Sequence, residues 1–163
     1  MSRSLVDHLA QYAKYHRDSR NILTHLIGIP LIVVAILTLL SRPEFSVGYL
    51  LLTPANLVVF VAVVFYIRLD IPLGLLMTVL LWLGLSVSRE LAALPTTAWL
   101  IFGIGLFVVG WIFQFIGHYF EGKKPAFIDD IMGLAIGPLF VVTEVIFFLG
   151  LRKQLKNEVE KRQ

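Results

Sequence analysis

The chain of 163 residues is strongly apolar: 58% of its residues are hydrophobic, 15% are charged and its mean hydropathy is +0.83. A soluble domain is about half apolar and a quarter charged, so most of this chain is expected to lie in lipid. The net charge of +3, concentrated at the two ends, favours contact with membrane lipid head groups over nucleic acid. Cysteine is absent, which excludes disulfides, iron–sulfur clusters and thiolate metal sites.

The first expected element is a short amphipathic helix over residues 4–16. Its apolar positions recur at helical spacing and end on a histidine: Leu5, Leu9, Tyr12 and His16. We expect this helix within a cytoplasmic segment, residues 1–21, at the membrane surface or at the mouth of a site. A basic tail, residues 152–163, is expected on the same side.

Five apolar stretches approach the ~20 residues that a helix needs to cross a bilayer. They are Ile22–Leu40, Val47–Ile67, Ile71–Val87, Thr97–Gly117 and Ile131–Leu151. The second carries Pro54 and Asn56, so an irregular start is expected, and the break before the third is short enough to require a hairpin. The predicted fold is therefore all-α: a polytopic transmembrane bundle of four to five segments over residues 22–151, within one domain, 1–163.

The distribution of lysine and arginine bears on the number of crossings. Five crossings would leave seven basic residues on each side, whereas four would leave twelve inside against Arg42 and Arg89 outside. We therefore expect the last stretch not to cross but to break at Gly133, Gly137 and Pro138 into a re-entrant hairpin. The membrane would be the bacterial inner membrane or that of the endoplasmic reticulum.

Three histidines stand where apolar stretches meet water on the cytoplasmic side: His16, His25 and His118. An ionisable side chain at such a boundary raises the free energy unless it is paired, solvated or bound to a metal. His16 and His25 are nine residues apart, about 180° around one helix, so they can share an ion only if the helix breaks between them. The segment Arg17–Asn21 supplies good capping residues for such a break.

Candidate partners lie one helical turn from two of these histidines, because Asn21 precedes His25 and Glu121 follows His118. Two or three histidines with one carboxylate suit a non-haem Fe(II) ion that activates O₂, while zinc and manganese stay open. Glu144, inside the last apolar stretch, is a further catalytic candidate. Asp129 could support the site, or cap a helix together with Asp130. The structural alternatives are histidines bonded to head groups, a solvated Glu121 and a protonated Glu144 between helices.

Several ordered motifs resemble the small membrane family typified by the fungal 2-hydroxy-fatty-acid dioxygenase. They extend over about residues 8–150: Tyr12…His16…Asn21…His25…Gly28-Ile29-Pro30, Gln114…Gly117-His118…Phe120-Glu121…Pro125-Ala126 and Gly137-Pro138-Leu139-Phe140…Glu144. The resemblance implies an Fe(II)-dependent α-oxidation, in which a 2-hydroxy fatty acid reacts with O₂ and becomes one carbon shorter. It implies metal ligands at His16, His25 and His118.

This chain departs from that family's pattern at one position. The pattern has a second histidine beside the first, where this chain has Tyr15 or Arg17, which leaves Glu121 or Glu144 as replacement ligands. The substrate carboxylate would be neutralised by one of three cations: Arg17, Arg20 or Lys123.

Other classes of function stay open. A b-type haem protein could use His25 and His118 as axial ligands and would show a Soret band. A non-catalytic membrane protein, in which the histidines only pack, would tolerate His25→Ala. A transporter would need a site near the middle of the membrane, where only Glu144 is available.

Overall fold

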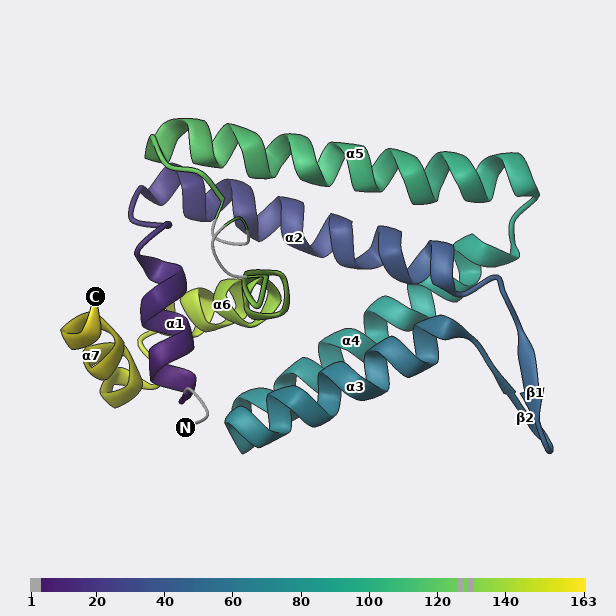
Figure 1. The fold of residues 1–163 in the computed structure, drawn as a ribbon, viewed down its shortest axis with the longest axis horizontal. Helices are drawn as coiled ribbons and strands as arrows, with labels where there is room; N and C mark the ends of the chain where they lie inside the picture. The colour runs from purple at the N-terminus through teal and green to yellow at the C-terminus, as the bar shows by residue number, and fades with distance from the viewer. Residues whose placement is uncertain (1–3, 126–127, 129–130) are drawn as a thin grey trace. The chain divides into compact units, whose positions relative to one another are not determined.

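The computed structural model describes residues 4–125, 128 and 131–163, and within these residues the fold is helical apart from one short β-hairpin (Figure 1). The elements are α1 (Leu5–Ala13), α2 (Ser19–Leu40), β1 (Phe45–Val47), β2 (Leu50–Leu52), α3 (Pro54–Leu69), α4 (Ile71–Ala93), α5 (Thr96–Glu121), α6 (Gly133–Phe148) and α7 (Lys153–Arg162). The predicted all-α class is confirmed. Ala126, Asp129 and Asp130 lie outside the described residues, so the roles predicted for them are not addressed.

The chain divides into two compact units. The first comprises Met1–Ile29 with Ile112–Gln163, and the second comprises Pro30–Trp111. The long helices α2 and α5 each contribute to both units. Every residue predicted to carry chemistry belongs to the first unit. That a single domain covers residues 1–163 stays a prediction.

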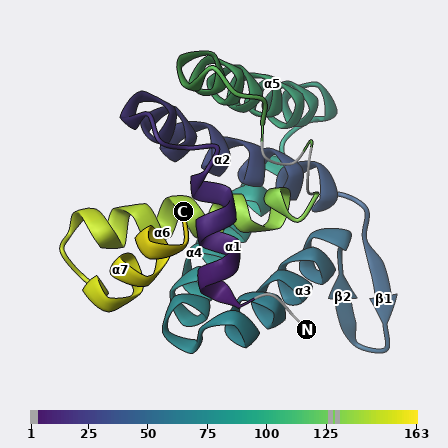
Figure 2. The same cartoon turned by 60° about the vertical axis from the view of Figure 1, so that its left-hand side comes forward.

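Helix α1 is the predicted amphipathic helix, and it ends three residues before His16. Ser4 and Asp7 form a capping box at its start, in which each side chain bonds the other residue's backbone. Leu5, Leu9 and Tyr12 form its buried face. This face packs against α6 and α7, beside which α1 lies in Figure 2. Protein therefore covers the apolar side of α1.

Helix α6 corrects one prediction, because the last apolar stretch forms one uninterrupted helix and no re-entrant hairpin. Pro138 lies inside this helix and removes one i→i−4 backbone hydrogen bond, yet the helix continues past it to Phe148. Gly137 serves packing: a Cβ there would lie 3.0 Å from Tyr12 Oη and 3.2 Å from Ile29 Cδ1. The 16 residues of α6 span about 24 Å, less than the ~30 Å of a bilayer core.

In the part of the chain that the structure describes, three helices are long and apolar enough to cross a membrane: α2, α4 and α5. Helices α3 and α6 are apolar but shorter, so the count of four or five crossings stays a prediction. Helix α3 begins later than expected, because the hairpin of β1 and β2 occupies part of the second apolar stretch. Thr53 caps α3 and Pro54 opens it, which confirms the predicted irregular start.

The second unit contains the predicted hairpin of α3 and α4. Asp70 ends one helix and caps the next: its N–H donates to Tyr66 O (3.1 Å), and its carboxylate accepts from Leu73 N (2.9 Å). A Cβ on Gly74 would lie 2.5 Å from Ile67 Cα, so the two backbones are in contact there. A small buried cluster of Leu37, Ala55 and Leu85 joins α2, α3 and α4.

Candidate metal centre

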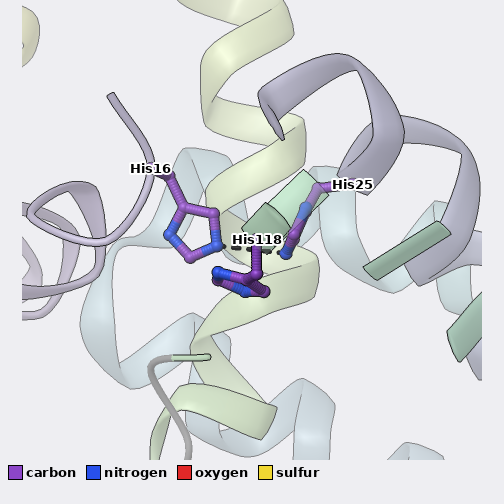
Figure 3. Close-up of side chains that lie close together, drawn as sticks. All are labelled: His16, His25 and His118. Atoms are coloured by element: carbon purple, nitrogen blue, oxygen red, sulfur yellow. Dashed lines mark hydrogen bonds between the residues drawn. The ribbon is translucent and has the colours of Figure 1, made fainter. Parts of the chain in front are cut away.

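The three predicted histidines meet in the first unit (Figure 3). His16 lies in the turn after α1, His25 lies in α2 and His118 lies in α5. Their candidate ligand nitrogens all lie within 4.8 Å of one another. The side chains are buried, with exposed fractions of 2%, 1% and 6%. No carboxylate of a described residue belongs to this group.

The break between α1 and α2 brings His16 back to His25. Helix α1 ends at Ala13 and α2 begins at Ser19, as the capping residues of this segment predict. The change of direction places His16 Nε2 only 3.1 Å from His25 Nε2. The two rings are nearly perpendicular, with an interplanar angle of 77°.

Backbone carbonyls fix the protons on these two rings. His16 Nδ1 lies 2.8 Å from Tyr12 O, and His25 Nδ1 lies 2.9 Å from Asn21 O. A carbonyl oxygen can only accept, so each Nδ1 carries the proton and each neutral ring presents an unprotonated Nε2. Two lone pairs then face each other at 3.1 Å, an arrangement that needs a cation between or beside them.

A proton does not meet this need near neutral pH. The pKa of His16 is lowered to about 4, mainly by burial and in part by the positive charge that a protonated His118 would carry. A metal ion fits better, because two nitrogens about 2.1 Å from one ion, at angles of 90–109°, lie about 3.0–3.4 Å apart.

His118 completes the donor set. Its Nδ1 is buried and has no hydrogen-bond partner within the described part of the chain. A buried ring nitrogen without a partner raises the free energy of the fold unless a ligand satisfies it. Three neutral imidazole nitrogens therefore fit a divalent first-row metal.

Glu121 connects the end of α5 to the turn that carries His16. Its Oε1 and Oε2 accept from Arg17 N (3.0 and 2.9 Å), and Oε2 also accepts from Asp18 N (2.8 Å). Asn21 Nδ2 donates to the same oxygen at 3.2 Å. This carboxylate clamp fixes the backbone directly after His16 against the helix that carries His118.

Asn21 lies beside the histidines and is fully buried. Its Nδ2 also donates to Tyr15 O (3.1 Å), while its backbone carbonyl accepts from His25. Gly117 lets α5 approach at this point, because a Cβ there would lie 2.3 Å from Asn21 Oδ1 and 3.1 Å from His25 Nδ1. The missing side chain at Gly117 therefore allows α5 and α2 to pack closely beside the cluster.

Two aromatic rings that sequence reasoning did not assign form an apolar wall beside the histidines. Tyr12 stacks on His16, with centroids 4.2 Å apart and an interplanar angle of 1°. Phe140 of α6 lies 4.8 Å from the Tyr12 ring and 5.4 Å from the His16 ring. The only sequence signal for this wall was the spacing of Tyr12 one helical turn before His16.

The remaining predicted residues lie outside the histidine group. Glu144 is partly buried in α6, and it interacts electrostatically with the charged side chains of Lys156 and Glu160 in α7. Arg20 pairs with Asp18 at 2.7 Å. Lys123 Nζ donates to Lys14 O at 2.7 Å. Two of the three cations predicted to neutralise a substrate carboxylate therefore have partners in the protein.

The geometry leaves no room for the haem alternative. The centroids of the His25 and His118 rings are 4.9 Å apart and the rings are nearly perpendicular, at 86°. The centroid of the His16 ring lies 5.0 Å from that of the His118 ring. A flat macrocycle cannot pass between rings arranged in this way, so the cluster fits a single ion.

Two comparisons with known proteins relate this chain to a 2-hydroxy-palmitic acid dioxygenase. The family model described as 2-hydroxy-palmitic acid dioxygenase Mpo1-like matches residues 2–149. The chain is 36% identical over 167 aligned residues to the 2-hydroxy-palmitic acid dioxygenase MPO1 of Saccharomyces cerevisiae. That alignment covers 98% of this chain and 91% of the yeast protein. No solved structure matches the chain.

Proposed function

Since this chain belongs to the 2-hydroxy-palmitic acid dioxygenase Mpo1-like family, we propose that it is an Fe(II)-dependent dioxygenase of 2-hydroxy fatty acids. The family resemblance expected from the sequence motifs is thereby confirmed. The observation that carries the proposal is the pair of unprotonated Nε2 atoms of His16 and His25, 3.1 Å apart and buried beside His118.

The proposed reaction balances without any reductant. A 2-hydroxy fatty acid and one O₂ give a fatty acid one carbon shorter, CO₂ and water. The bond between the carboxyl carbon and the hydroxyl-bearing carbon breaks, and the latter is oxidised to the new carboxyl group. Both oxygen atoms of O₂ are reduced and end in the products.

We assign the metal to His16 Nε2, His25 Nε2 and His118 Nδ1. When bound there, Fe(II) supplies the redox chemistry through which O₂ reacts with an organic acid, and three protein ligands leave coordination positions open. The carbonyls of Tyr12 and Asn21 hold two of the rings in the ligating tautomer. Tyr12 and Phe140 shield one side of the cluster from water.

Asn21 and Glu121, predicted as catalytic residues, are proposed to act by positioning. Their bonds to each other and to the turn after His16 keep the three rings together. Glu144 is kept as a proposed catalytic carboxylate, because it is partly buried in an apolar helix. Arg17 is the cation that we propose for the substrate carboxylate.

The setting that we propose for this reaction is the cytoplasmic face of a membrane, either the endoplasmic reticulum membrane or the bacterial inner membrane. Three helices are long and apolar enough to cross it. The N-terminal segment and the loop after Glu121 carry basic residues, which membrane proteins concentrate on the cytoplasmic side. The acyl chain of the substrate would lie among the apolar helices with its polar head at the boundary.

The test is turnover of a defined substrate by protein purified anaerobically in detergent. With Fe(II), 2-hydroxypalmitate should be consumed together with one O₂ per molecule, and pentadecanoic acid should appear. Palmitate, which lacks the hydroxyl, is the matched control and should not react. Absence of pentadecanoic acid from iron-loaded protein would sink the proposed activity.

A further inference from the structure

A second polar site lies in the other unit, where a cavity of about 370 Å³ opens between the ends of several helices. Cavities that hold small ligands measure about 300–1,000 Å³. Six polar or charged residues line this one: Ser41, Arg42, Glu44, Thr53, Asn56 and Arg89. We call it the arginine pocket, and we propose that it binds a phosphate group, carried by a lipid head group or free in solution.

Arg42 gives the strongest reason for an anion. Its Nη1 is buried and has no hydrogen-bond partner among the residues that the structure describes. A guanidinium stays charged at any relevant pH, so burial of an unpaired donor raises the free energy of the protein until an acceptor arrives. Arg42 lies over the Trp99 ring, 4.5 Å from its centroid, and Trp99 Nε1 is fixed by Thr38 O at 2.9 Å. The stacked ring holds the guanidinium in position for a ligand.

Other donors converge on the same cavity. Ser41 is 5% exposed, and its hydroxyl also lacks a hydrogen-bond partner within the described ranges. Arg89, near the end of α4, brings a second guanidinium to the wall. Thr53 and Asn56 form the capping box of α3, so the positive end of that helix lies at the pocket. A phosphate, with three or more acceptor oxygens, suits two guanidiniums and a hydroxyl.

One carboxylate opposes these charges, since Glu44 is also part of the wall. Its side chain is exposed, and no ion pair among the described residues joins it to Arg42 or Arg89. Two guanidiniums against one carboxylate leave the wall with one net positive charge. Glu44 thus weakens an anion site without neutralising it.

The position of the pocket supports a lipid as the carrier of the phosphate. Arg42 follows the end of α2, Arg89 lies near the end of α4 and Trp99 lies in the first turn of α5, and these three helices are long and apolar enough to cross a membrane. Helix ends of this kind lie at the depth of lipid head groups. The adjoining β-hairpin exposes Phe45 and Tyr49, aromatic residues typical of that boundary.

The experiment measures binding to the full-length protein in detergent by native mass spectrometry and thermal shift. The probes are dioctanoyl phosphatidylglycerol, inorganic phosphate, dioctanoylglycerol and octanoate. Saturable binding of phosphatidylglycerol alone identifies a lipid head group as the source, and binding of inorganic phosphate as well identifies a free anion. Binding of dioctanoylglycerol or octanoate equal to that of phosphatidylglycerol would overturn the phosphate assignment.

Substitutions locate the site. Arg42→Gln and Arg89→Gln should each raise Kd about tenfold or more, because each removes a charge-assisted hydrogen bond. Arg68→Gln, the same change at the far end of α3, should leave Kd unchanged, and Glu44→Gln should lower it. Arg89 is exposed, so its variant should keep its unliganded melting temperature even if Arg42→Gln does not. An unchanged Kd in Arg89→Gln, or an equal loss in Arg68→Gln, would contradict the proposal.

Discussion

The histidine cluster and the arginine pocket both bury polar atoms that have no partner among the described residues. The two sites differ in how their side chains are held in place. In the cluster, backbone carbonyls fix two rings at their Nδ1 atoms before any ligand arrives. In the pocket, Arg42 is held by stacking on one ring, and Arg89 is exposed. A site fixed by backbone bonds should lose function abruptly when one part is removed, whereas a site built from charges should weaken by degrees.

The largest effect is expected from His25→Ala. Removal of one of three ligands should abolish stoichiometric iron binding and turnover, because two imidazoles hold Fe(II) much more weakly than three. His8→Ala is the matched control, since His8 lies in α1 outside the cluster, and it should retain iron. The measurement is the iron content of the two purified variants. A His25→Ala protein with full iron would contradict the expected abrupt loss, because the cluster would then weaken by degrees as well.

Gly117→Ala should have the next largest effect. The new methyl group would lie 2.3 Å from Asn21 Oδ1 and 3.1 Å from His25 Nδ1, so either these side chains or α5 with His118 must shift, and each shift disturbs the cluster. Overpacking of this kind destabilises proteins by about 1–3 kcal/mol, and iron should be lost. Gly105→Ala, in the same helix, is the control because a Cβ there meets nothing within 4 Å. Melting temperatures and iron content of the two variants should differ clearly, and equal behaviour would exclude the close approach.

Glu121→Gln should have a smaller effect on iron binding, because it disturbs the residues that position the cluster and leaves the three ligands in place. The neutral amide accepts less strongly from the backbone N–H groups of Arg17 and Asp18, so the turn after His16 should loosen. Iron affinity should fall on the order of tenfold. Glu90→Gln is the control for the loss of charge. An unchanged iron Kd in Glu121→Gln would show that the clamp does not position the ligands.

Acidification should separate the two sites with a smaller effect. The pKa of His16 is lowered in the fold from 6.5 to about 4, so the unfolded chain takes up its proton first as the pH falls. The stability that this histidine contributes to the metal-free protein is therefore complete above pH 6.5 and is lost toward pH 4. Arginine stays charged throughout this range, so the two guanidiniums of the pocket add no pH dependence of this kind. Melting curves of metal-free wild type and His16→Gln should show a reduced pH slope in the variant.

Local sequence features predicted much of the cluster. The capping residues between His16 and His25 indicated the helix break, and the spacing of His118 and Glu121 placed both on one face of a helix. Long-range contacts could not be predicted in this way. The spacing did not reveal that the Glu121 carboxylate accepts from backbone N–H groups of residues more than 100 positions away.

The last apolar stretch shows the opposite limit. Its glycines and proline favoured a broken segment, but Gly137 is there to admit Tyr12, a contact between α6 and α1 that local propensity does not contain. Similarly, the β-hairpin before α3 overlaps the start of an apolar run whose composition resembles a spanning helix. Tertiary packing decided the form of α6.

The three-histidine metal centre is tested most directly by the metal content and X-ray absorption of protein purified anaerobically with Fe(II). We predict about one iron per chain, no Soret band, and nitrogen scattering from three imidazoles at about 2.1 Å. Protein that holds no iron after reconstitution, or whose iron has fewer imidazole ligands in the wild type than this set requires, would contradict the assignment of His16, His25 and His118.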